Sequence, residues 1–528
     1  MSKGTYSFTT PIYYVNAAPH LGTAYTTVAA DTVARYQRMN GYDVAFVTGM
    51  DEHGQKVAET AEKNGMTPQA WCDSMEPVFR EAWDLLDITY TDFVRTSEPR
   101  QARTVQKFWQ DLYDRGWLYK GAYEGWYCVH EETYYAESDL EKNEDGEFVC
   151  PDCKRPVRRA SGEENWFFKL SEFQEPLLKF YEEHPDFIRP ETRRNEVVTF
   201  VKGGLQDLSI SRSTFDWGVP LPFDEGHVAY VWADALLAYL TGIGYADPER
   251  EGEFDARWPM QYHFVGKDIT RFHCVIWPAM LMAAGMPITH TVFGHGFLLT
   301  KGEKMSKSKG NALKPADLCK VFGVDAYRYY FMSDVQFGAD GSISLERMVQ
   351  VYNADLANTW GNLCSRVFNM TKKYFDGAVP EVPAEVKAKE NPLREISDAL
   401  YAEYDACMAQ VDFTGAAAAV QKLASRVNLY VEESAPWNLA KDEAKHEELA
   451  AVIYNALEAC RIIALYLAPF MPNTSAEVFR RLSLGDIADV ADIEAATAWG
   501  QLPAGNAVEK GEPLFPRLDV DAIDLSFE

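Results

Sequence analysis

The sequence predicts an α/β protein with a doubly wound parallel sheet, a small mixed insertion within that sheet, and a C-terminal bundle of α-helices. Strand-like and helix-like segments alternate over the first 115 residues, as they do in parallel sheets. Short aromatic strands and a CxxC pair interrupt this alternation over residues 116–223. From about residue 351, alanine-rich helical stretches are separated by prolines, which is typical of antiparallel bundled helices.

The length of 528 residues exceeds what one hydrophobic core normally holds, so several domains are expected. Residues 228–239 should re-enter the sheet and begin a helix, and residues 291–299 should form the last strand before a lysine-rich loop. The predicted boundaries are 1–115 and 224–300 for the two halves of the sheet domain, 116–223 for the insertion, 301–350 for the loop and connecting region, and 351–528 for the helical domain.

Composition favours a cytoplasmic protein without a membrane span. No window approaches the roughly 18 uninterrupted apolar residues of a membrane helix, and the N-terminus lacks the apolar core of a secretory signal. Nine scattered cysteines fit a reducing compartment better than a disulfide framework. A formal charge of −28 argues by itself against binding nucleic acid, but local basic clusters decide contact.

The first 54 residues are predicted to form a βαβ unit. The sequence HLGT at residues 20–23 links the first strand to a helix, which Gly41 should end because glycine accepts the left-handed conformation. The second strand ends near Gly49, and Asp51 follows. Open parallel sheets bind ligands at the carboxyl ends of their strands. Asp51 could pair there with a substrate ammonium group, or it could simply cap a turn.

Two segments indicate phosphate chemistry. In HLGT, Gly22 allows close approach to a helix N-terminus, and His20 could donate to a phosphate oxygen. The alternative is a capped turn with a packed histidine. In KMSKS at residues 304–308, Lys304 and Lys307 belong to a cationic loop that could stabilise leaving pyrophosphate. The alternatives are a solvated basic loop or a nucleic-acid patch.

Two further groups are expected at the strand ends. Gly266 and Asp268, followed by His273, could hold a ribose, or Asp268 could cap a helix. The other group is apolar and suits a flexible thioether, although such a helical stripe is more often core. Its members are Ile12, Tyr14, Trp232, Ala235, Leu236, Tyr239 and His295.

Cys150 and Cys153 form the CxxC pair of one half of a zinc-ribbon site. The other half has Cys128, but Glu131 stands where the second cysteine of its pair would be. A tetrahedral site needs a fourth ligand, which Glu131 or His130 could supply. A degenerate knuckle without metal and a redox CxxC remain alternatives.

HLGT and KMSKS, in this order and separation, resemble the two signatures of class I aminoacyl-tRNA synthetases. Within that class the chain resembles the methionyl-tRNA synthetase family over nearly its full length. The segments that carry this resemblance are PIYYVN at 11–16, TGMDEHG at 48–54, YVWADA at 230–235, KMSKS at 304–308, NLCSR at 362–366 and APW at 435–437.

The resemblance implies a Rossmann-type catalytic domain, a connective insertion with a zinc knuckle, and an α-helical anticodon domain. It implies ligation of L-methionine to tRNA(Met) through methionyl-adenylate, with ATP used as its Mg²⁺ complex and Zn²⁺ at the knuckle. No dimerising module is evident, so a monomer is expected.

The implied methionine site is Ile12, Tyr14, Asp51, Trp232, Ala235, Tyr239 and His295. The implied catalytic and ATP-binding residues are His20, Gly22, Gly266, Asp268, Lys304 and Lys307. The implied anticodon readers are Asn362, Arg366 and Trp437, and the implied metal ligands are Cys128, Glu131, Cys150 and Cys153.

Two alternatives stay open at this point. Another class I enzyme, for cysteine, leucine, isoleucine or valine, would share both signatures, although residues 116–223 leave no room for a large editing insertion. A catalytically silent tRNA-binding paralogue would need neither signature.

Overall fold

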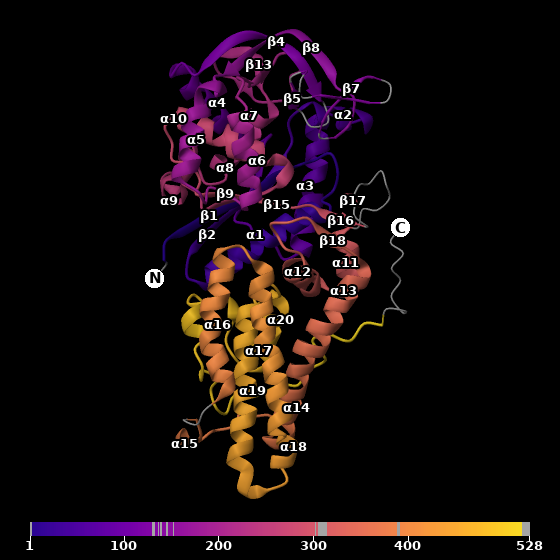
Figure 1. Cartoon of the computed structure of the whole chain (residues 1–528), viewed down its shortest axis with the longest axis vertical. Helices are drawn as coiled ribbons and strands as arrows, with labels where there is room; N and C mark the ends of the chain where they lie inside the picture. Colours follow the sequence, from indigo (N-terminus) through magenta and orange to yellow (C-terminus); the bar gives the residue numbers. More distant parts are fainter. Residues whose placement is uncertain are drawn as a thin grey trace.

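The molecule is elongated and has three layers along its long axis, as the computed structural model shows (Figure 1). Arched antiparallel strands lie at one end, a parallel sheet flanked by helices lies in the middle, and a helical bundle forms the other end. The predicted fold class is therefore confirmed. The structure describes residues 3–519 except 129–132, 136, 138–139, 144–145, 152, 301–302, 305–313 and 388–390.

The central sheet has six strands in the order β3-β2-β1-β14-β15-β9, and every neighbouring pair is parallel. Because all strands run the same way, their carboxyl ends meet at one edge. The edge strand β9 comes from the range that the sequence predicts as the insertion. The strands are β1 (Thr5–Tyr14), β2 (Asp43–Asp51), β3 (Asp92–Arg95), β9 (Ile188–Arg189), β14 (Tyr262–Gly266) and β15 (Thr291–His295).

Helix α1 (Leu21–Met39) connects β1 to β2 and follows the predicted pattern. Its residues Tyr25, Val28, Ala29, Tyr36 and Met39 are buried and belong to the core on one face of the sheet. His20 is its N-cap, and Gly41 has a φ of 88°, the left-handed conformation that ends the segment at no steric cost. The predicted βαβ unit is thus confirmed.

The two faces of the sheet carry separate apolar cores. Phe293 of β15 packs on the face covered by α1, with Tyr25. Its neighbour Val292 packs on the opposite face, with Trp232 and Tyr239. Successive residues of a strand point to opposite faces of the sheet, so each strand end has side chains on both faces. The opposite face is covered by α4 (Pro99–Asp114), α7 (Val231–Ala235), α8 (Ala238–Thr241) and α10 (Trp277–Ala284).

The insertion is built on an antiparallel sheet of β10, β8, β4 and β5. The prediction that residues 228–239 re-enter the central sheet is wrong. Strand β13 instead pairs antiparallel with β11 and β12 in a separate sheet, and α7 follows it directly. The strands are β4 (Leu118–Cys128), β5 (Thr133–Tyr135), β8 (Arg158–Phe168), β10 (Leu208–Ser209), β11 (Ser211–Arg212), β12 (Pro220–Leu221) and β13 (Asp224–Ala229).

The predicted strand at residues 291–299 is two strands in different sheets. The chain leaves the central sheet after β15 and then forms β16 (Leu298–Thr300), which pairs with β17 (Glu303–Lys304) and β18 (Gly341–Ile343). Gly296 lies between the two strands, where a Cβ would lie 2.2 Å from the carbonyl carbon of Ala339. Strand β17 leads into the KMSKS segment, whose Lys307 lies outside the described residues.

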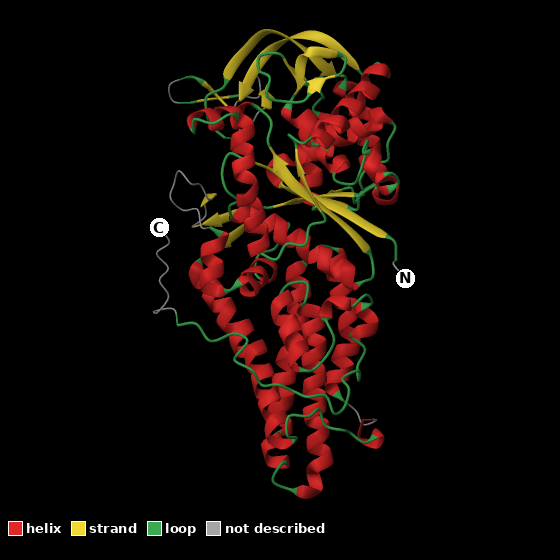
Figure 2. Cartoon of the chain, turned by 180° about the vertical axis from the view of Figure 1, so that it is seen from behind, coloured by secondary structure: helices red, strands yellow, loops and turns green. Residues whose placement is uncertain are grey.

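The C-terminal domain is a bundle of long helices, as predicted. Its segment 443–467 is apolar and long enough to cross a membrane, but 89% of its most apolar window is buried inside the bundle, as in a core helix. The chain then runs back along the bundle toward the sheet (Figure 2), where Leu518 exchanges two hydrogen bonds with Asn353. The helices include α14 (Asn362–Tyr374), α16 (Pro392–Ala409), α17 (Phe413–Ser434), α18 (Pro436–Leu439), α19 (His446–Leu467) and α20 (Pro472–Arg481).

Candidate active site

The exposed side chain of His20 is held against the N-terminus of α1. Its Nδ1 accepts hydrogen bonds from the backbone N–H groups of Gly22 (3.0 Å) and Thr23 (3.3 Å). Because Nδ1 is an acceptor, the proton of the neutral ring lies on Nε2. A Cβ at Gly22 would lie 2.9 Å from Cε1 of His20, so glycine is needed for the ring itself. The turn therefore presents a donor beside the positive end of a helix.

A second group gathers at the ends of β14 and β15. A Cβ at Gly266 would lie 2.5 Å from Oδ1 of Asp268 and 4.0 Å from Cε1 of His295. His295 is buried, with Nε2 2.7 Å from Oγ1 of Thr26 in α1. Burial lowers the pKa of His295, although the negative charge of Asp268 opposes this shift. Gly266 and Asp268, two of the residues predicted to bind ATP, thus lie near the helix that His20 caps.

His295 was expected among the methionine-binding residues, but in the structure it lies apart from Trp232 and Tyr239. Its ring contacts Tyr25 and Phe337, with centroids 5.6 and 5.1 Å away, on the face of the sheet covered by α1. Trp232 and Tyr239 lie on the opposite face. The physical reason is strand alternation, because His295 follows Phe293 by two residues and points the same way.

The other predicted methionine residues share one apolar core. Ile12, Trp232, Ala235 and Tyr239 belong to it, and Tyr14 packs against it. Trp232 stacks on Phe272 with ring centroids 3.8 Å apart and meets the edge of Tyr14 at 6.5 Å. The indole Nε1 of Trp232 has no hydrogen-bond partner among the described residues. The group is therefore predominantly aromatic and apolar.

Asp51 brings a buried carboxylate to this group. It ends β2 and lies opposite Tyr14 in the parallel register, with 3% of its surface exposed. Burial raises the pKa of the Tyr239 hydroxyl, and the charge of Asp51 raises it further. A carboxylate next to apolar side chains is the arrangement that an amino acid with a positive ammonium and a neutral side chain requires.

His273 is the histidine that accompanies Trp232 and Tyr239. Its Nε2 accepts a hydrogen bond from the Tyr239 hydroxyl at 2.6 Å, while its Nδ1 donates to the carbonyl of Ile269 at 3.0 Å. Burial lowers the pKa of His273 to about 4, so the ring stays neutral and keeps its acceptor. His273 sits in a π-helical turn, Phe272–Ile276, and such turns often occur at functional sites.

Lys267 joins the ATP side of the site to the base of the KMSKS segment. Its Nζ donates to Oδ2 of Asp340 at 2.6 Å, and Oδ1 of Asp340 accepts from the backbone of Phe297. Phe297 directly precedes β16, and Asp340 directly precedes β18. These two strands pair with each other, and β16 also pairs with β17. No role was predicted for Lys267 from the sequence.

Comparison with known families identifies this arrangement. The family description "tRNA synthetases class I (M)" matches residues 6–161 and 155–368. The description "Anticodon binding domain of methionyl tRNA ligase" matches residues 379–525. The chain belongs to the methionyl-tRNA synthetase family.

Individual methionyl-tRNA synthetases agree with this assignment. The chain is 50% identical to the methionine–tRNA ligase of Streptomyces coelicolor, with 97% of each chain covered. It is 47% identical to that of Caldanaerobacter subterraneus subsp. tengcongensis, covering 100% of this chain and 81% of that protein. The crystal structure of Mycobacterium tuberculosis methionyl-tRNA synthetase in complex with methionyl-adenylate superposes with a TM-score of 0.92 at 39% identity, covering 97% of this chain and 100% of that chain.

The residues predicted to read an anticodon belong to α14 and α18 of the helical domain and are at least partly exposed. Asn362 is exposed at the start of α14, and Arg366, one turn later, donates to Glu432 of α17 at 2.6 Å. Trp437, in α18 just after α17, is 37% exposed. This exposure favours a surface role for Trp437 over packing in the bundle core. These two helices thus expose one aromatic side chain and two side chains that can form hydrogen bonds.

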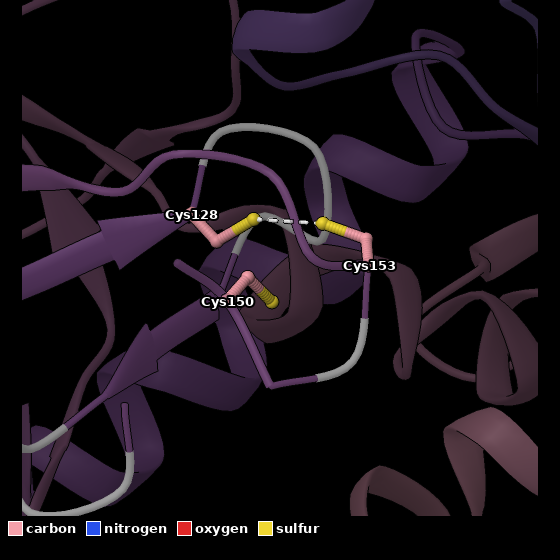
Figure 3. A group of neighbouring side chains, drawn as sticks. All are labelled: Cys128, Cys150 and Cys153. Atoms are coloured by element: carbon pink, nitrogen blue, oxygen red, sulfur yellow. Dashed lines mark hydrogen bonds between the residues drawn. The ribbon is translucent and has the colours of Figure 1, made fainter. Parts of the chain in front are cut away.

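Three cysteine side chains of the insertion point toward one another (Figure 3). The sulfurs of Cys128, Cys150 and Cys153 lie within 4.8 Å of each other, and those of Cys128 and Cys153 are 3.6 Å apart. Sulfur ligands about 2.3 Å from a tetrahedral zinc are separated by about 3.8 Å, so these residues fit such an ion. Glu131 and His130, the proposed fourth ligands, lie outside the described residues.

Proposed function

We propose that the chain ligates L-methionine to tRNA(Met) in two steps and consumes ATP. The carrying observation is that His20 and the carboxylate–aromatic group around Asp51 and Trp232 lie at the carboxyl ends of neighbouring parallel strands. One group suits a triphosphate and the other suits an apolar amino acid. Their proximity is what the joining of these two substrates requires.

In the first step, an oxygen of the methionine carboxylate attacks the α-phosphorus of ATP, and the bond to pyrophosphate breaks. Asp51 binds the ammonium group, and Ile12, Tyr14, Trp232, Ala235 and Tyr239 enclose the thioether. His273 holds Tyr239 in place through its hydrogen bond. Aromatic faces make favourable contacts with sulfur, which favours methionine over other apolar side chains.

ATP is bound on the other side of the strand ends, together with Mg²⁺ as its counterion. Asp268 accepts from the ribose hydroxyls, and Gly266 leaves room for its carboxylate. His20 donates its Nε2–H to the phosphate oxygens as negative charge grows, and the N-terminus of α1 adds its dipole. Lys304 and Lys307 neutralise the departing pyrophosphate.

In the second step, the terminal ribose hydroxyl of the tRNA attacks the acyl carbonyl of methionyl-adenylate, and AMP leaves. Asn362 and Arg366 form hydrogen bonds with anticodon bases, and Trp437 stacks on one of them, as side chains do with splayed single-stranded RNA. We propose that the enzyme works as a monomer in the cytoplasm.

The cysteine cluster binds Zn²⁺ through Cys128, Cys150 and Cys153, with Glu131, His130 or water as the fourth ligand. A closed structural zinc site stabilises a small domain that lacks a large core. Among the described residues, the buried local core consists of Val157 and the two ligands Cys128 and Cys150, so cross-linking by zinc would hold the hairpin together.

The experiment is pyrophosphate exchange into ATP, measured with each of the twenty amino acids, followed by charging of tRNA. Exchange should depend on methionine and should be followed by methionylation of tRNA(Met). Exchange with cysteine, leucine, isoleucine or valine would indicate another class I specificity. Binding of tRNA without any exchange would indicate a catalytically silent paralogue.

A further inference from the structure

A buried histidine–aspartate pair joins the two segments that hold the methionine site. Nδ1–H of His53 donates to Oδ2 of Asp234 at 2.5 Å, and the two side chains are 8% and 1% exposed. His53 follows Asp51 by two residues at the end of β2. Asp234 lies in α7, between Trp232 and Ala235. The pair therefore links the ammonium-binding segment to the segment that encloses the side chain.

Further hydrogen bonds fix the aspartate end of the pair. The side-chain amide of Gln101, in α4, donates to Oδ1 of Asp234 at 2.7 Å and accepts from Thr241 of α8 at 2.6 Å. Trp109, also in α4, donates its indole N–H to the carbonyl of Ala233. Helix α7 has only five residues and needs such supports, because a helix this short is not stable alone.

Trp217 of the insertion holds the histidine end. Its indole N–H donates to the carbonyl of Glu52 at 2.6 Å, and its ring meets the edge of His53 with centroids 5.1 Å apart. The loop after Asp51 thus has a fixed position relative to α7. No atom of this network was assigned a role by the proposed reaction.

We infer that His53 and Asp234 are positioning residues that set the distance between Asp51 and the Trp232–Ala235 segment. Methionine must reach both at once, so loss of the pair weakens methionine binding and leaves the ATP side unaffected. Discrimination between side chains of different length also depends on this distance. The inference rests on the proposed roles of Asp51 and Trp232.

The test compares KM values in methionine-dependent pyrophosphate exchange for wild type, His53→Ala, Asp234→Ala and the double variant. Each single change should raise KM for methionine about tenfold, because a buried hydrogen-bonding group is left unpaired. KM for ATP should stay within about twofold. KM for methionine in the double variant should not exceed that of the more impaired single variant, since the two residues act as one unit.

Asp234→Asn provides the conservative rescue. Its Oδ1 can still accept from Gln101, and its amide can donate to the neutral ring of His53, so KM for methionine should return to within about threefold of wild type. The matched control is Glu458→Gln, which alters a buried pair with Arg461 (2.7 Å) inside the bundle. It should lower the melting temperature without changing KM for methionine.

The inference is overturned if folded His53→Ala or Asp234→Ala keeps the wild-type KM for methionine, or if KM for ATP rises in parallel. Should Asp234→Ala fail to fold, His53→Ala carries the same comparison. Absence of methionine-dependent exchange in the wild-type protein would instead remove the proposed function. The two failures are therefore distinguishable.

Discussion

The two ends of the molecule present their functional residues in opposite ways. At the sheet, Asp51, Trp232, Tyr239 and His273 are buried and fixed by packing or hydrogen bonds. At the bundle, Trp437 is exposed.

The difference matches the size of the two ligands. A small amino acid is recognised by enclosure, where each buried hydrogen bond that is broken costs about 1 to 3 kcal/mol. An RNA loop is too large to enclose and is recognised on a surface. The partly exposed pair of Arg366 and Glu432 is worth only about 0 to 1 kcal/mol, so Arg366 can exchange its carboxylate for a base at little cost. We therefore propose that the site of methionine activation is rigid, whereas the surface that reads the anticodon is adaptable.

The largest effect is expected at the activation end, from Lys307→Ala. Lys307 should neutralise charge that grows on the leaving pyrophosphate, so its loss should slow exchange by about 100-fold. KM for methionine should change little, because this charge develops only in the transition state. An unchanged exchange rate would remove the loop from the mechanism.

A smaller effect, on KM for methionine, should distinguish residues on the two faces of the sheet. His273→Ala removes the acceptor of the buried Tyr239 hydroxyl and should raise KM for methionine about tenfold. His295→Ala is the matched control on the face covered by α1 and should leave KM for methionine within about twofold. The reverse result would assign His295, and not His273, to the methionine site.

Zinc removal should affect stability more than activation. Protein expressed with ample metal should contain about one zinc per chain, and Cys150→Ser should lose it and unfold at lower temperature. Exchange should stay within about threefold of wild type, since the cluster lies apart from the residues that bind substrate. Elemental analysis without zinc in the wild-type protein would favour a knuckle that needs no metal.

The smallest expected effect is a mild acid sensitivity of the sheet end. Among the described residues, the histidines whose pKa is lowered by burial are His263, His273 and His295, all in or beside the sheet. The folded protein keeps His273 neutral to about pH 4, whereas an unfolded chain protonates it near pH 6.5. The unfolded state therefore binds more protons, and stability falls as the pH drops below 6.5.

From pH 7 to pH 6, His273 should account for a loss of under about 1 kcal/mol of unfolding free energy. Urea titrations at both pH values can measure this loss. His273→Gln should show a smaller loss than wild type, and an equal loss would mean that His273 does not cause the pH dependence.

Local motifs could predict which residues lie at the strand ends but not which of them meet. HLGT and Asp51 were placed correctly because each follows a strand of one βαβ unit. His295 was grouped with Trp232 and Tyr239, although its spacing from Phe293 was a usable signal that it points to the other face of the sheet. The contact between His273 and Tyr239 had no such signal, because it joins two helical segments that are far apart in the sequence. The pair of His53 and Asp234 was likewise invisible, since its residues are 181 positions apart.

The separation of the two ends is tested most directly by Trp437→Ala, assayed for both half-reactions. Stacking on an aromatic side chain is worth about 1 to 3 kcal/mol per base, so charging of tRNA(Met) should fall by at least about tenfold. Methionine-dependent pyrophosphate exchange should be nearly unchanged, because that step needs no tRNA. A parallel fall of both activities, with a lower melting temperature, would show that Trp437 supports the fold and would contradict the account.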